Sequence, residues 1–191
     1  MNKRMILLMV VLSSILFAEK SEIYLFGGVT FASICYDDNY LQSNIDMSAR
    51  TGFNFGIDMT EKNFKGGIGF TQFGSNFDLS SLGYGEASDT YNYITFYATI
   101  CHPLQQVKFF GGIQGGKSIG GTATIEGVDS NTISADNFNF DFGVLAGIEA
   151  MLTPKFGLRA SYYYGFANVI KGAYYNYKNR GISICLLTKI Q

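Results

Sequence analysis

The sequence predicts an all-β protein, folded as an eight-stranded antiparallel up-and-down transmembrane β-barrel. Three observations indicate this fold class. Apolar residues recur at every second position, charged residues make up only 15% of the chain, and long and short connections alternate. Period-two alternation is typical of strands with two unlike faces. Because a soluble domain usually carries about 25% charged residues, the shortage of charge favours a barrel whose apolar face lies outward in lipid.

The clearest strand signal is a hairpin from Asn137 to Phe166, with two arms around the turn Thr153-Pro154-Lys155. Each arm is long enough to cross a bilayer as a tilted strand, which takes about 9 to 11 residues. The opposite faces hold mainly Gly, Ser, Asn and ions, which suit a narrow wetted lumen. The apolar faces are expected to point outward, and they consist of Phe138, Phe140, Phe142, Val144, Ala146, Ile148 and Ala150, then Phe156, Leu158, Ala160, Tyr162, Tyr164 and Phe166.

Six further stretches alternate in the same way, and they lie at 23–36, 52–59, 64–71, 90–100, 107–118 and 181–190. Long connections at 37–50, 74–89, 119–136 and 168–179 alternate with short ones at 60–63, 101–106 and 153–155. Outer-membrane barrels have this asymmetry, with short periplasmic turns and long external loops. Both termini are therefore expected in the periplasm. Eight strands also close around an interior that side chains fill.

Residues 1–18 predict a secretory signal peptide. Lys3 and Arg4 supply the positive end, an apolar run follows, and Ala18 is a small residue at the expected cleavage site. The run is too short for a transmembrane helix. Residues 19–191 are then expected to form one outer-membrane β-barrel domain.

The predicted inward face carries three acids and four bases. Because a buried charge without a partner is costly, we expect them to neutralise one another as a lumen charge network. If residues i and 308 − i face each other across the Thr153-Pro154-Lys155 turn, Glu149 lies opposite Arg159. We expect that ion pair to plug and rigidify the barrel. The network comprises Asp58, Lys65, Lys108, Asp141, Glu149, Arg159 and Lys189.

Other motifs point to no catalytic, cofactor-binding or metal-binding residues. Gly111–Ser118, GGIQGGKS, matches a phosphate-binding loop, but the residues that follow cannot readily form the helix which that mechanism needs. His102 is the only histidine, and we expect it in a solvated periplasmic turn. No spacing resembles a calcium-binding loop, and a net charge of −1 gives no reason to expect nucleic acid.

The series GGVTFASI, GGIGFTQFG, YNYITFYATICHPL, FFGGIQGG, FDFGVLAGIEA and LRASYYYGF resembles the small eight-stranded outer-membrane barrels of the porin-like, PorT-like family. The likeness covers nearly the whole mature chain. It implies an outer-membrane location, surrounding outer-membrane lipid, and assembly by the barrel-insertion machinery.

The sequence favours a non-enzymatic outer-membrane barrel, a structural scaffold that presents external loops for recognition or adhesion. The partner of those loops is left open. One alternative is a soluble secreted up-and-down barrel with reversed faces that binds an apolar ligand inside. Another is an accessory component of an outer-membrane secretion system.

Overall fold

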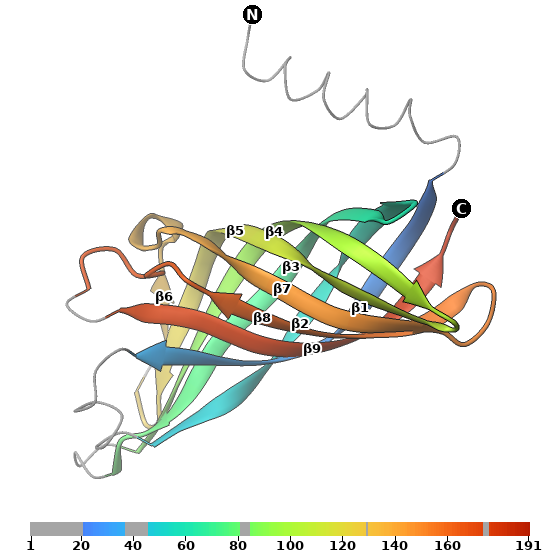
Figure 1. Cartoon of the computed structure of the whole chain (residues 1–191). Coiled ribbons are helices and arrows are strands. Elements are labelled where there is room, and N and C mark those ends of the chain that lie inside the picture. Colours follow the sequence, from blue (N-terminus) through green and yellow to red (C-terminus); the bar gives the residue numbers. More distant parts are fainter. Residues whose placement is uncertain (1–20, 37–45, 81–84, 129, 174–175) are drawn as a thin grey trace, which may run out of the picture.

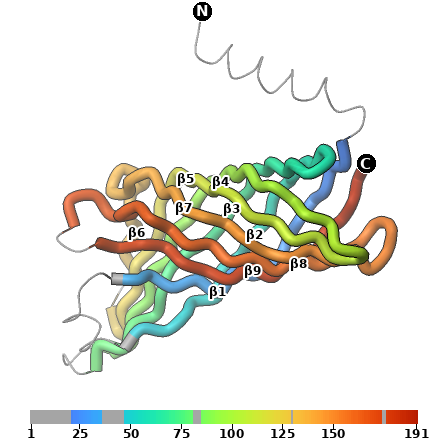
Figure 2. The backbone as a smooth tube through the Cα atoms, in the orientation of Figure 1, coloured from blue at the N-terminus to red at the C-terminus, as the bar shows by residue number. Residues whose placement is uncertain are grey.

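A computed structural model describes residues 21–36, 46–80, 85–128, 130–173 and 176–191. Within these ranges, eight long strands form a closed antiparallel ring in which neighbours along the chain pair and the first and last strands meet. Figures 1 and 2 show the tilted strands lying side by side in one barrel-shaped sheet. The strands are β1 (Glu22–Tyr36), β2 (Asp46–Glu61), β3 (Phe64–Asp78), β4 (Glu86–Leu104), β5 (Val107–Ile125), β7 (Phe140–Met151), β8 (Phe156–Gly165) and β9 (Tyr177–Lys189).

The barrel has a turn end and a loop end. At the turn end, β2 joins β3, β4 joins β5, and β7 joins β8 by tight connections, and β1 begins beside the end of β9. Ile23 N donates to Gln191 O over 3.0 Å, so the two chain ends of the barrel meet there. At the loop end, the connection between β5 and β7 contains a short strand, β6 (Asn131–Ile133), and a 3-10 turn, η3 (Ala135–Asn137). The alternation of long and short connections is the predicted one.

The predicted faces of the wall are confirmed along most of the barrel. In β1, for example, Leu25 and Phe31 are exposed, whereas Tyr24, Phe26 and Thr30 are buried. No described helix is long and apolar enough to cross a membrane. An exposed apolar belt therefore surrounds the barrel, and its large side chains include Phe53, Phe55, Phe64, Ile68, Phe96, Ile100, Ile113, Phe142, Ile148, Leu158, Ile184 and Leu186.

One expectation about the faces was wrong in detail. Phe138 is only 1% exposed, because the strand pattern is interrupted after η3 and β7 begins at Phe140. Its ring packs against Tyr91 and Tyr93, with centroids 5.0 and 6.3 Å away. The lumen also holds several other large rings, among them Phe73, Phe110 and Tyr163. Glycines on the wall leave room for them: Phe26 reaches toward Gly56 and Gly69, and Phe110 toward Gly147.

The strands extend further toward the loop end than the alternation predicts. The β3–β4 ladder continues to Asp78 and Glu86, and β5 continues to Ile125. Hydrogen bonding between neighbouring strands does not require an apolar face, so polar segments prolong the sheet beyond the belt. At the turn end the predicted connection 101–106 is also shorter than expected. Leu104 pairs with Val107, so His102 lies in the last part of β4, opposite Phe109.

A buried charge cluster in the barrel lumen

Arg159 is the centre of a charge cluster in the lumen. It comes from β8 and lies directly opposite Glu149 of β7, because the β7–β8 register pairs residues whose numbers sum to 308. Arg159 Nε donates to Glu149 Oε1 over 2.6 Å. Its Nη2 forms an ion pair with Asp58 of β2. One guanidinium therefore links two carboxylates from strands that are not neighbours in the wall.

Lys65 of β3 completes the cluster by pairing with the same Oε1 of Glu149. Four charged side chains from β2, β3, β7 and β8 thus meet, two acidic and two basic, and their charges sum to zero. All four residues are at most 5% exposed. Because a buried ion is stable only when it is paired and hydrogen-bonded, this matching of charge is what permits four ions in a narrow interior.

Aromatic side chains surround the cations. Tyr97 of β4 donates its hydroxyl proton to Asp58 Oδ2 over 2.8 Å and accepts from Arg159 Nη1 over 3.1 Å. The guanidinium carbon lies 4.9 Å from the ring centroid of Phe26, and Lys65 Nζ lies 5.3 Å from that of Phe110. Cations are attracted to such ring faces. Seven of the eight long strands therefore contribute side chains to one contact network across the lumen.

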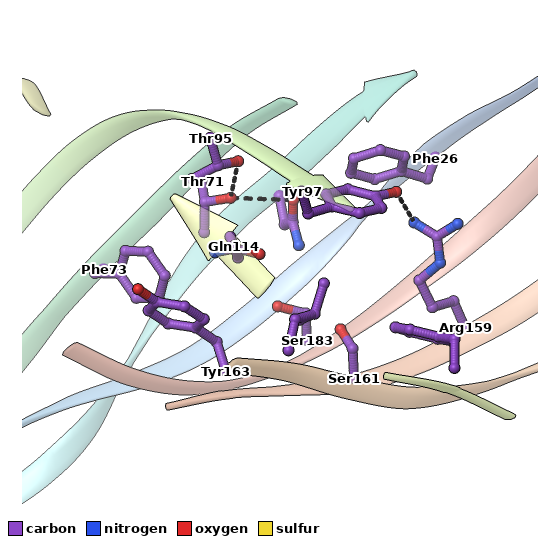
Figure 3. A pocket seen from close by; sticks show the side chains of 13 residues that line it. Phe26, Thr71, Phe73, Thr95, Tyr97, Gln114, Arg159, Ser161, Tyr163 and Ser183 are labelled. Atoms are coloured by element: carbon purple, nitrogen blue, oxygen red, sulfur yellow. Dashed lines mark hydrogen bonds between the residues drawn. The ribbon is translucent and has the colours of Figure 1, made fainter. Parts of the chain in front are cut away.

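A small cavity of about 30 Å³ lies beside the cluster, toward the loop end. Figure 3 shows Arg159 and Tyr97 at one side of it and Phe73 with Tyr163 at the other. Between them its wall is polar, with Thr71 and Thr95 hydroxyl oxygens 3.2 Å apart and Ser183 close to Thr30. A cavity of this volume has room for about one water molecule.

Two bases of the predicted network lie elsewhere. Lys108 Nζ and Lys189 Nζ contact Glu22 at 3.4 and 2.6 Å, forming a half-buried group near the turn end. Tyr24 also donates to Glu22, over 2.8 Å. Glu22 was not among the predicted residues. The signal was present, because Glu22 continues the inward alternation of Tyr24 and Phe26 by one step.

Asp141 departs from the predicted neutralisation by a base. It is 2% exposed, and Asn179 Nδ2 donates to its Oδ2 over 2.9 Å. Tyr93 and Tyr163 also lie close to this carboxylate. Arg159, the cation on the neighbouring strand β8, lies opposite Glu149, further along β7 toward the turn end. A face assignment alone could not show this, because it gives no height along the barrel.

The other sequence candidates are also placed. Gly111–Ser118 lies inside β5, which continues as strand to Ile125, so the helix required by a phosphate-binding loop is replaced by strand. Lys117 of that motif donates to Phe138 O over 3.3 Å. His102 is exposed on the outer side of β4. Among the described residues, no three His, Cys, Asp or Glu side chains are grouped as metal ligands.

No protein-family model and no curated protein matches the sequence. Solved structures do match. Neisserial surface protein A (NspA) aligns with a TM-score of 0.62 and 16% identity, covering 90% of this chain and 100% of that chain. Ail, the attachment invasion locus protein of Yersinia pestis, aligns with a TM-score of 0.52 and 14% identity, covering 89% and 99%. A complex of Ail with the heparin analogue sucrose octasulfate gives 0.52 and 15%, with the same coverage. The fold is therefore that of the small eight-stranded outer-membrane β-barrels.

Proposed function

We propose that this chain is a non-enzymatic integral protein of the outer membrane, a rigid barrel that presents its loop end for recognition or adhesion. The observation that carries the proposal is the exposed apolar belt. Large apolar side chains on all eight long strands are 38–68% exposed, whereas the buried ions lie inside. Soluble monomers rarely expose a contiguous apolar patch beyond a few hundred Å². In lipid the same belt is solvated by acyl chains.

The closed ring of hydrogen bonds supports the same proposal. Within the described chain each long strand is paired on both sides, and the pairing of β1 with β9 leaves no long edge open. A strand edge cannot face lipid, because its N–H and C=O groups would lack partners. In this proposal the turn end and both termini lie in the periplasm and the loop end lies outside the cell.

The soluble alternative needs the apolar face inside and a ligand cavity. Cavities for drug-sized apolar ligands are about 300–1,000 Å³, whereas the central cavity here is about 30 Å³. The lumen is occupied by the charge cluster and its aromatic rings. We therefore infer that the cluster plugs and rigidifies the barrel, and that the interior binds no apolar ligand.

The loop end is the surface available for a partner. A hollow of about 650 Å³ opens there between the extended strands, and its wall includes Asp78, Glu86 and Glu126. Hydrogen bonds from the Ser80 side chain and backbone N–H lower the pKa of Asp78. These carboxylates would repel a polyanion, so we do not propose that this chain binds the heparin analogue found in complex with Ail. Membership of the porin-like, PorT-like family, the signal peptide at 1–18 and the barrel domain at 19–191 belong to the proposal as well.

The test is fractionation of cells that express the full chain, followed by electrophoresis with and without heating. We expect the protein in the outer-membrane fraction, faster migration before boiling, and an N-terminus near residue 19. Protease added to intact cells should cut connections at the loop end and spare the turns. Recovery in the soluble periplasm would contradict the proposal, and cleavage at the turn end would reverse the orientation.

A further inference from the structure

The outer surface of the wall carries a group of basic residues at the loop-end margin of the apolar belt. Lys117 of β5 is exposed between the buried residues Gly116 and Ser118, so its side chain points outward. Arg180 of β9 lies between the buried Asn179 and Gly181, which places it on the same side of the wall. Lys178 lies two residues before Arg180 and is therefore on the same outward face. On the outward positions of β5, β7, β8 and β9 in the described chain, all charged side chains are basic.

Arg180 is held in a defined position. Its guanidinium carbon lies 4.5 Å from the ring centroid of Tyr164, the residue opposite it on β8, and Nη2 donates to the Tyr164 hydroxyl over 3.1 Å. Nε is buried and has no hydrogen-bond partner among the described residues. An arginine that is stacked on a ring in this way keeps part of its donor fork for another acceptor, and guanidinium geometry matches phosphate.

Aromatic side chains fill the surface between Lys117 on β5 and the basic residues on β9. Phe142 and Phe166 lie 6.1 Å apart between ring centroids, and Tyr164 lies 5.6 Å from Phe166. Lys117 is opposite Phe140, which adjoins this group on β7. Lys117 and Arg180 thus lie on either side of this aromatic surface, three strand spacings or roughly 14 Å apart across the wall. Lys117 is nearer the loop end than Ile113, which shares a row with Arg180 through Val144 and Tyr164. Acyl chains would contact the rings, and a headgroup would lie at the height of the cations.

We propose that Lys117, Lys178 and Arg180 bind the phosphate groups of an outer-leaflet lipid on the outside of the barrel. Anionic groups attract cations that lie at a membrane surface, and long basic side chains reach from the apolar region to the headgroups. The site rests on the proposed membrane location. It is distinct from the loop-end hollow, whose wall includes Asp78, Glu86 and Glu126, and from the buried cluster, whose cations lie inside the lumen.

The experiment uses the mature barrel refolded into phosphatidylcholine bicelles, with diphosphoryl lipid A as the probe. Retention of the probe through detergent exchange is measured for the wild type and for the triple variant Lys117→Ala, Lys178→Ala, Arg180→Ala. Retention should fall by roughly a hundredfold in the triple variant, about fivefold for each basic residue removed. Lys155→Ala removes an exposed cation at the turn end and should retain the probe like the wild type. Heat-dependent mobility verifies that each variant is folded.

Three further arms identify the ligand. Dephosphorylated lipid A should be retained weakly by the wild type, and inorganic phosphate should compete poorly because it cannot contact the aromatic surface. The Arg180→Lys variant should retain less of the probe than the wild type, since lysine has no guanidinium to stack on the Tyr164 ring. Equal retention of phosphorylated and dephosphorylated lipid, or equal retention by wild type and triple variant, would overturn the site while leaving the membrane location intact. A wild-type barrel that fails to enter bicelles at all would overturn both proposals.

Discussion

Glu149 and Arg159 face each other across the β7–β8 hairpin, and Arg159 Nε donates to Glu149 Oε1 over 2.6 Å. Arg159 also pairs with Asp58, while Lys65 pairs with Glu149. The two acids and two bases therefore depend on one another, and removing one member leaves an uncompensated charge in the lumen. This dependence leads to two predictions about the cluster.

Arg159→Ala should destabilise the barrel in detergent by about 3–5 kcal/mol, because Asp58 and Glu149 would share only Lys65. The double variant Glu149→Gln with Arg159→Gln leaves one acid and one base, and it should lose less. Thermal unfolding followed by circular dichroism measures both. If the single and double variants melt together, charge balance is not what stabilises the cluster.

Tyr97→Phe should cost about 1.5–3 kcal/mol, since the lost hydroxyl bonds to charged groups on both sides. It donates to Asp58 and accepts from Arg159, and the phenylalanine keeps the ring. Chemical unfolding in detergent gives the free-energy difference. In an Arg159→Ala background the same substitution should cost less, and purely additive effects would argue against coupling through the hydroxyl.

Phe138→Ala should destabilise the fold by about 3–5 kcal/mol, because it empties a buried site against Tyr91 and Tyr93. Phe140→Ala is the matched control two residues further along the chain, where the ring is 46% exposed on the belt. Heat-dependent gel mobility measured across temperature compares them. A larger loss for Phe140→Ala would mean that the inward and outward assignments at the start of β7 are reversed.

Gly28→Ala should impair folding, whereas its neighbour Gly27→Ala should be tolerated. An added Cβ at Gly28 would lie 1.9 Å from Ile184 O of β9, but at Gly27 the nearest atom is Phe55 Cβ at 3.9 Å. Overpacking of this kind typically costs about 1–3 kcal/mol or more. Refolding yield from urea into detergent micelles tests the pair, and equal yields would contradict the close approach of β1 to β9.

The wall could be predicted from the sequence because its signal is local. Alternation assigns each residue to a face, and the turn Thr153-Pro154-Lys155 fixes the β7–β8 register, so the opposition of Glu149 and Arg159 followed from counting. The contact of Arg159 with Asp58 could not follow in the same way. Those residues are 101 positions apart in the chain, and their meeting depends on the tilt and stagger of strands around the ring.

The errors have related causes. Phe138 looked like part of a continuous outward face, but η3 interrupts the strand before it, and a short turn leaves little pattern in a polar segment. The inward faces of the Asn137–Phe166 hairpin predict a lumen of mainly small residues and ions, whereas the lumen also holds the large rings of Tyr93, Tyr97 and Phe110. They fit because glycines on the neighbouring strands leave room for them: Gly67 pairs with Tyr97, and Gly147 pairs with Phe110. Alternation within one strand does not show what the neighbouring strand provides.

The pairing of β1 with β9 also constrains the order of assembly. Glu22 and Lys189, which contact each other at this seam, are 167 residues apart. Until β9 is in place, β1 and β8 each have an edge whose backbone N–H and C=O groups lack partners, and lipid acyl chains cannot form hydrogen bonds with them. The chain therefore cannot enter a bilayer one strand at a time in the order of synthesis. Either the whole sheet closes as it inserts, or another protein must cover the two edges while they wait for β9.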